Sequence, residues 1–190
     1  DEQNFATSLA DMVSLVIEQQ DQRIANQELL LAASVFSNSL QAIMITDRQG
    51  RILKINPAFS QITGYGTEEA IGESSSLFRS HQHDDRFYRD LWRALNETGH
   101  WQGEIWNRRK NGEIFPIWQT ITSVSNEQGE IVRYISIFDD ISEQKEWEKR
   151  IHHLAFFDAL TELPNRRLFE ERLSHGLELV RRTQQHLALL

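Results

Sequence analysis

Histidines are the side chains in this sequence with the most scope for metal or proton chemistry. His81 and His83 lie in one segment and His152 and His153 in another, without an evident set of carboxylates beside them. A zinc site needs three or four ligands that converge on one point, so this spacing predicts no metal site. The sequence contains no cysteine, which excludes disulfides, cysteine-ligated metals and thiol catalysis. We therefore expect neither metal chemistry nor thiol chemistry of this chain.

Two amide side chains, Asn107 and Gln119, are the polar groups best placed to bind a small molecule. Each lies on a predicted strand, where successive residues face opposite sides, and each shares its side with apolar residues. A buried amide needs hydrogen-bond partners, which a ligand, an ordered water or a backbone carbonyl would supply. The other candidates for lining this pocket are Met44, Phe59, Phe87, Leu91, Trp92, Ser136 and Phe138.

Three cations lie beside a turn in the segment Asn107-Arg-Arg-Lys-Asn-Gly112. They could bind phosphate, but a charged hairpin tip in water explains them as well, and the net charge of −8 favours the second interpretation. Proteins that bind nucleic acid usually carry a basic face, so this acidic chain predicts no nucleic-acid partner.

Length and composition are ordinary for a globular chain. The 190 residues allow one domain with extensions or two small domains. No apolar run approaches 18 residues, and residues 1–20 lack the basic start and apolar block of a signal peptide. We expect no membrane span within the chain and a cytoplasmic location.

The predicted elements are short strands around a group of helices. Asn56 and Pro57 predict the start of a short helix that ends at Gly64, and a longer helix is predicted from Asp84 to Thr98. Two strands, several helices and then three strands indicate an α+β fold with a five-stranded antiparallel sheet. The predicted strands are Ala42–Thr46, Arg51–Ile55, Gln102–Arg109, Glu113–Ser125 and Glu130–Asp139.

The face of the sheet opposite the pocket is predicted to be apolar. Strand alternation places four large side chains there: Trp106, Trp118, Ile135 and Ile137. A protein normally covers such a patch. We expect the end of the N-terminal helix, including Leu31 and Val35, to cover it, either in the same chain or from a second copy.

Two helices are predicted to flank the sheet. Residues 1–36 contain neither proline nor glycine, and Phe5, Leu9, Met12 and Val16 follow a coiled-coil spacing. An amphipathic helix lying on its own domain is the alternative. The second helix spans residues 143–157. It follows a capping box of Asp140 and Glu143 and carries a stripe at coiled-coil spacing formed by Trp147, Ile151 and Leu154.

Four motifs give residues 37–142 a resemblance to the PAS domain of the S-box type. They are Ala58-Phe-x-x-Ile-Thr-Gly-Tyr65, Trp101-x-Gly-Glu104, Asn107-Arg-Arg-Lys-Asn-Gly112 and Phe138-Asp-Asp-Ile-Ser-Glu-Gln-Lys145. The resemblance implies a sensor fold with short helices on one face of the sheet and a pocket between them.

The PAS resemblance suggests three cofactors to consider. Haem-binding members use a histidine on the long helix, where this chain has Phe87-Tyr88, and we expect His81 and His83 just before it to be exposed loop residues. Light-sensing flavin members need a cysteine, which is absent. The resemblance therefore argues against haem and excludes the light-sensing flavin class.

FAD stays open as the third cofactor, beside a small-molecule ligand or an empty pocket. The chain resembles redox-sensing PAS domains of the nitrogen-fixation regulator type. Their flavin-contacting tryptophan and asparagine match Trp92 and Asn107, but Met44 and Ser75 stand where these domains have a serine and a glutamate.

Residues 158–190 resemble the opening segment of GGDEF domains, which condense two GTP molecules into cyclic di-GMP. The motif is Asp158-Ala-Leu-Thr-Glu-Leu-Pro-Asn-Arg-Arg167, and Leu187-Ala-Leu-Leu190 resembles the start of that family's first strand. The signature Gly-Gly-Asp/Glu-Glu-Phe does not occur, so we expect no catalysis from this chain. The resemblance implies a parent diguanylate cyclase, with a phosphodiesterase domain as an option. Residues 1–36 more weakly resemble the exit helix of a GAF domain.

Two functional hypotheses follow. In the first, a ligand or redox change in the pocket alters a homodimer formed by the N-terminal and 143–157 helices, and the change reaches the cyclase domain. In the second, the pocket is empty, and the domain is a dimerisation spacer that relays a signal from upstream. A cavity lined by Asn107 and Gln119 would favour the first hypothesis.

Overall fold

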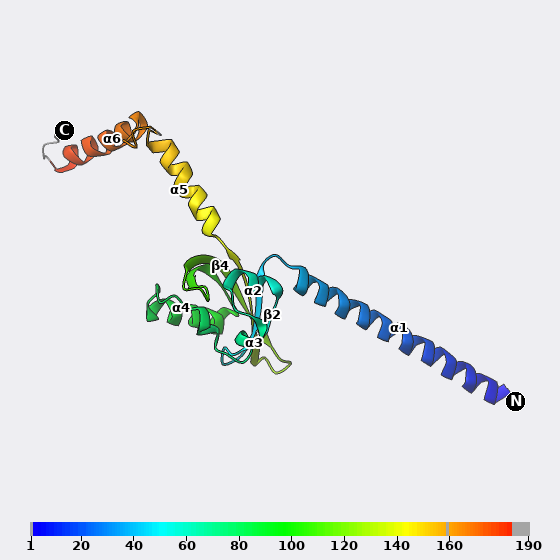
Figure 1. The fold of residues 1–190 in the computed structure, drawn as a ribbon. Helices are drawn as coiled ribbons and strands as arrows, with labels where there is room; N and C mark the ends of the chain where they lie inside the picture. The colour runs from blue at the N-terminus through cyan, green and yellow to red at the C-terminus, as the bar shows by residue number, and fades with distance from the viewer. Residues whose placement is uncertain (1, 159, 184–190) are drawn as a thin grey trace. The chain divides into compact units, whose positions relative to one another are not determined.

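The computed structural model of the chain describes residues 2–158 and 160–183, and for residues 2–18, 176, 179, 181 and 183 it describes the backbone alone. The chain divides into two compact units at Asp140 and Ile141 (Figure 1). The first unit holds the sheet and the candidate site, and the second holds two helices. The predicted seam of Phe5, Leu9, Met12 and Val16 falls where the structure describes the backbone alone, so its side chains are outside the description. The predicted strand at Leu187–Leu190 lies outside the described residues.

The first unit is built on a five-stranded antiparallel sheet, as predicted. The strands follow the order β2-β1-β5-β4-β3, so the two ends of the domain meet at its centre. Gly112 and Gly129 have φ angles of 93° and 79°, which glycine adopts without strain, and they close the two hairpins. The strands are β1 (Ala42–Asp47), β2 (Ile52–Ile55), β3 (His100–Arg108), β4 (Ile114–Ser125) and β5 (Ile131–Asp140).

Short helices cover one face of this sheet (Figure 1). Asn56 caps α2 by accepting a hydrogen bond from the Phe59 N–H at 3.0 Å, and Asp84 caps α4 in the same way. Gly64 and Gly99 end these helices in the left-handed conformation. The helices are α2 (Pro57–Thr63), α3 (Thr67–Ala70), the 3₁₀ helix η1 (Ser75–Phe78) and α4 (Asp85–Thr98).

An aromatic cluster forms the centre of the core. The Phe59 ring lies 5.6 Å from the Phe78 ring and 5.8 Å from the Phe138 ring, both edge to face. Asn56 ties β1 to α2, because its side chain accepts from the Ile43 N–H and donates to the Gln41 carbonyl. These contacts fix the helices against the strands and so set the walls of the space between them.

The helix α1 (Glu2–Asn38) precedes the sheet. At its end, the Lys54 ammonium lies 4.7 Å from the centre of the Phe36 ring. Leu31 and Val35 are 67% and 62% exposed, and Trp118 on the outer face is also exposed. The helix therefore does not cover the outer face within one chain, and packing against a second copy stays a proposal.

The second unit contains α5 (Ser142–Phe156) and α6 (Arg166–Thr183). The predicted capping box at the start of α5 is wrong. Ile141 occupies the cap position without a side-chain cap bond, and Asp140 is the last residue of β5. Asn165 joins the two helices, since it donates to the Ala155 carbonyl and accepts from the Leu168 N–H.

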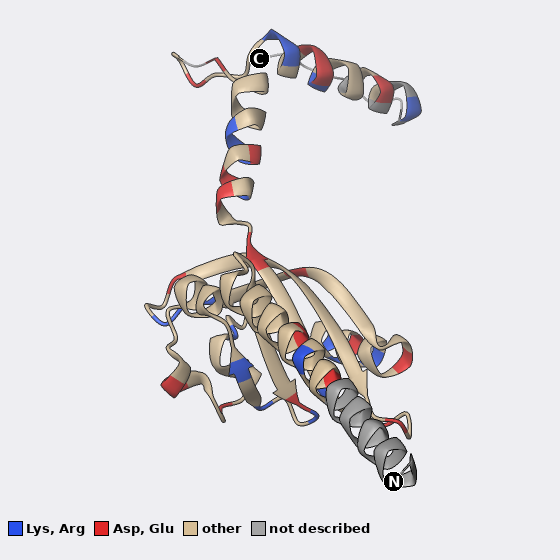
Figure 2. Ribbon diagram, turned by 90° about the vertical axis from the view of Figure 1, so that its right-hand side faces the viewer, with Lys and Arg blue, Asp and Glu red and all other residues tan. Residues whose placement is uncertain are grey.

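Charges are interspersed over the described residues. Figure 2 shows Lys and Arg alternating with Asp and Glu along the helices and loops, while the strands carry few charges. Among the described residues, no helix combines the length and apolarity that crossing a membrane requires.

Candidate ligand-binding site

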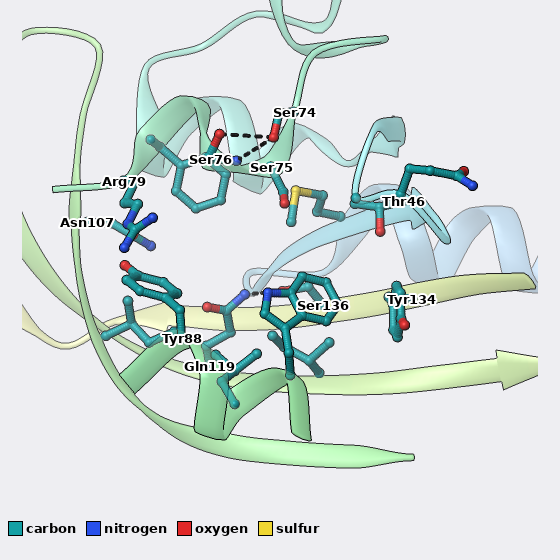
Figure 3. Close-up of a pocket in the computed structure, with 18 residues that line it drawn as sticks. Thr46, Ser74, Ser75, Ser76, Arg79, Tyr88, Asn107, Gln119, Tyr134 and Ser136 are labelled. Carbon is teal, nitrogen blue, oxygen red and sulfur yellow. Dashed lines mark hydrogen bonds between the residues drawn. The ribbon is translucent and has the colours of Figure 1, made fainter. Parts of the chain in front are cut away.

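A cavity of about 240 Å³ lies between the sheet and the helices (Figure 3). Six of the predicted pocket residues line it, namely Met44, Leu91, Trp92, Asn107, Gln119 and Ser136. The other three do not. Phe59 and Phe138 belong to the aromatic core, and Phe87 packs against the Trp101 ring at 5.9 Å.

The two amides that sequence analysis singled out differ in their hydrogen bonding. Gln119 donates one hydrogen bond to the Ser136 hydroxyl across β4 and β5, so this buried pair has a partner within the protein. Asn107 is 4% exposed, and its side chain makes no hydrogen bond to the residues that the structure describes. A buried amide normally has a hydrogen-bond partner. The Asn107 side chain can therefore take a water or a ligand as its partner.

Arg79 and Tyr88 line the cavity next to Asn107, and sequence analysis missed both. The guanidinium of Arg79 lies 3.6 Å from the centre of the Tyr88 ring, and the Arg79 backbone pairs with that of Asn107. Figure 3 shows the three side chains at the same end of the cavity. Arg79 Nε and the Tyr88 hydroxyl are both buried and lack a hydrogen-bond partner among the described residues.

Helical spacing could have found Tyr88, which precedes Leu91 and Trp92 by three and four residues and so shares their face. Nothing periodic marks Arg79. It follows η1 in an irregular segment that long-range bonds hold in place, including one from the Ser75 N–H to the Gly50 carbonyl.

His83 is not an exposed loop residue, and that expectation was wrong. Its ring stacks on Phe87 at 4.0 Å, and its Nε2 accepts a hydrogen bond from the Trp106 N–H at 3.0 Å. Burial lowers the pKa of His83 below its ordinary value of 6.5, with Arg79 adding to the effect and Glu104 and Asp84 opposing it. His83 therefore favours the neutral form, which can accept this bond.

We expect acid to destabilise the domain in part through His83. The unfolded chain binds the proton more readily, so this contribution to stability is complete above pH 6.5 and is lost as the pH falls through the lowered pKa. Between about pH 7 and about pH 5, the melting temperature should fall less in His83→Gln than in the wild type. His81→Gln, at an exposed position, is the control; equal slopes in all three proteins would contradict the assignment.

Arg109 corrects a second expectation. This residue of the basic hairpin segment is not a solvated side chain. Its side chain is 17% exposed and lies 3.8 Å over the Phe115 ring. It also pairs with Glu113 and Asp140 and donates to the Ile62 carbonyl. Arg109 thus joins the end of α2 to the last residue of β5.

The predicted outer-face residues lie opposite the cavity. Trp118 is exposed, while Ile117 and Gln119 beside it are buried. Trp106, Ile135 and Ile137 are half-buried. The described residues contain no group of three side chains that could hold a metal ion.

Comparison with known proteins accounts for this architecture. Residues 40–143 match the family described as PAS domain. The chain belongs to the PAS domain family. Beyond the PAS domain, residues 155–190 match the family described as diguanylate cyclase, GGDEF domain.

Three relatives illustrate the match. The chain is 32% identical over 120 residues to the nitrogen fixation regulatory protein of Klebsiella oxytoca, covering 63% of this chain and 24% of that protein. It is 24% identical over 152 residues to the probable diguanylate cyclase DgcE of Escherichia coli, covering 79% of this chain and 14% of that protein. The crystal structure of a PAS domain from Colwellia psychrerythraea is 28% identical, with a TM-score of 0.58, and the match covers 60% of this chain and 98% of that one. The chain thus spans about a quarter of the length of the nitrogen fixation relative.

The PAS cavity can be tested for a flavin. Trp92 and Asn107 line the cavity, and they match flavin contacts in the resemblance to nitrogen-fixation regulators. Met44 and Ser75 also line it, at the two positions that do not match. A thioether and a short hydroxyl cannot replace the serine and glutamate contacts there. The volume of about 240 Å³ is also below the roughly 300–1,000 Å³ of pockets for drug-sized ligands. These residues do not fit FAD.

Proposed function

We propose that this chain is the sensory and dimerising part of a cyclic di-GMP signalling protein. Its PAS domain binds a small molecule, and the bound state is passed through α5 to a GGDEF domain. The observation that carries the proposal is the cavity lined by the buried amides Asn107 and Gln119. A passive spacer would not need an open cavity with buried amides in its wall, and its pocket would be packed with side chains.

The proposed partner in dimerisation is a second copy of the chain. On α5, Trp147, Ile151 and Leu154 are 54%, 64% and 60% exposed, although their spacing of four and three residues forms one stripe. Such a stripe is buried when two helices form a coiled coil. The exposed Leu31 and Val35 on α1 offer a second surface of the same kind.

The proposed route from cavity to α5 runs through the two strands that share the Gln119–Ser136 bond. β5 carries Ser136 in the cavity wall and ends at Asp140, immediately before the cap residue of α5. Arg109 holds Asp140 through a charge-assisted bond. A ligand that shifts β5 would alter this contact, and coupling of about 1–3 kcal/mol is typical of such relays.

The chain purified from cells is expected to contain or bind a colourless small molecule, detectable by mass spectrometry after denaturation. Because the sequence has no cysteine, Lys149→Cys on α5 provides a single site for a spin label. A dimer should give one distance between the two labels, and this distance should change between the loaded and emptied protein.

Three results would count against the proposal. If no molecule is released or bound, the spacer hypothesis is favoured. If the labels show no coupling between copies, the dimeric relay is wrong. A visible spectrum with the bands of an oxidised flavin would replace the colourless ligand by FAD, the redox alternative that the sequence resemblance to nitrogen-fixation regulators implies.

A further inference from the structure

We infer that the ligand of the cavity is a small organic acid with an apolar body. Its carboxylate is bound by Arg79, Tyr88 and Asn107. The inference rests on the proposed function, because it assumes that the cavity is the sensor site, and it adds the chemical class of the ligand.

The first argument comes from hydrogen-bond donors. Arg79 Nε and the Tyr88 hydroxyl are buried and unpartnered among the described residues, and the Asn107 amide is buried beside them. A guanidinium can only donate, while a hydroxyl and an amide can each donate. Their shared complement is a group that only accepts, and an ionised carboxylate has two such oxygens. A buried donor without a partner has lost its hydrogen bonds to water without replacement, so occupation of this end is favourable.

The second argument comes from charge. Arg79 is the one charged side chain among the described residues that line the cavity. Its Nη2 lies 3.4 Å from Asp85 Oδ1, but the Asp85 side chain is 86% exposed. An ion pair with so exposed a partner is weak. The cavity therefore has a positive end that the protein only partly neutralises, and this end favours an anion over a neutral ligand.

The third argument comes from the remaining walls. Leu91, Ile105 and Ile121 are apolar, and Gln119 and Ser136 are hydrogen-bonded to each other. An inorganic anion would fill the polar end and leave these walls without a partner. An apolar cavity of about 150 Å³ accommodates benzene, so about 240 Å³ has room for a ring and a short chain ending in a carboxylate.

Calorimetric titration with 3-phenylpropionate tests the inference, with 3-phenylpropionamide as the neutral analogue of the same shape. The wild type is expected to bind the acid at least about tenfold more tightly than the amide. Arg79→Gln should abolish this preference, and Tyr88→Phe should weaken binding of the acid severalfold. Arg79→Lys should keep part of the preference. Arg86→Gln is the matched control, since Arg86 is exposed on α4 and pairs with Asp90 outside the cavity.

The outcomes separate this inference from the proposed function. Equal affinity for acid and amide, or an unchanged preference in both Arg79→Gln and Tyr88→Phe, would overturn the carboxylate site and leave a sensor cavity for neutral ligands. Inorganic phosphate that binds as tightly as the acid would also overturn it. If neither compound binds and the molecule released from the purified chain carries no carboxylate, the inference fails alone. If nothing is bound or released, the proposed function fails with it.

Discussion

Replacing Arg109 by alanine is expected to destabilise the PAS domain by about 3 kcal/mol, the cost of removing one partner from a buried ion pair. The side chain is largely buried and makes four contacts, with the Phe115 ring, the Ile62 carbonyl, Glu113 and Asp140. Its removal leaves the half-buried Asp140 carboxylate without this cation and opens space over Phe115. The midpoint of urea unfolding measures the loss.

Two variants sharpen this prediction. Arg86→Ala removes an exposed arginine whose contact with Asp90 is 3.8 Å, so it should change stability by less than about 0.5 kcal/mol. Arg109→Lys keeps the charge but loses the planar group over the ring and the forked hydrogen bonding, and it should lie between the two. A loss in Arg109→Ala no greater than in Arg86→Ala would show that the buried network contributes nothing to stability.

The double variant Ile151→Glu and Leu154→Glu is expected to raise the dissociation constant of the dimer by roughly 100-fold or more. Burying each aliphatic side chain is worth about 1.5–3 kcal/mol, and a tenfold change in affinity corresponds to about 1.4 kcal/mol. In one chain both residues are exposed, so the substitutions should leave the melting of the PAS domain nearly unchanged. Sedimentation equilibrium measures the association.

Lys149→Glu is the control for charge on α5, because Lys149 lies two residues from Ile151 on the opposite side of the helix. It should leave association intact. A wild-type chain that stays monomeric at tens of micromolar, or a double variant that associates as tightly as the control, would rule out the proposed coiled coil of α5.

Features with a local cause were predictable from the sequence. Asn56, Pro57 and Gly64 predict α2, and Asp84 and Gly99 predict α4, because capping depends on residues within one turn. The β4 and β5 alternation predicts that Gln119 and Ser136 face one way and Trp118 the other, because a strand repeats every two residues.

Features that depend on contacts between residues distant in the sequence were not predictable from it. Asp140 looked like a helix cap by spacing, yet it ends β5 and pairs with Arg109, 31 residues away. His83 looked like an exposed loop residue, yet its ring accepts a bond from the backbone of Trp106. No local pattern encodes either partner.

The sequence alone determined the α+β class, the sheet and the side of it on which Asn107 lies, since periodicity and turn residues act within a few positions. Only the tertiary structure decided which residues complete the cavity. Arg79 follows η1, in a segment that is held by backbone bonds such as that from the Ile52 N–H to Glu73. These bonds close long loops and carry no side-chain signature, so the charged end of the site exists only once the chain has folded.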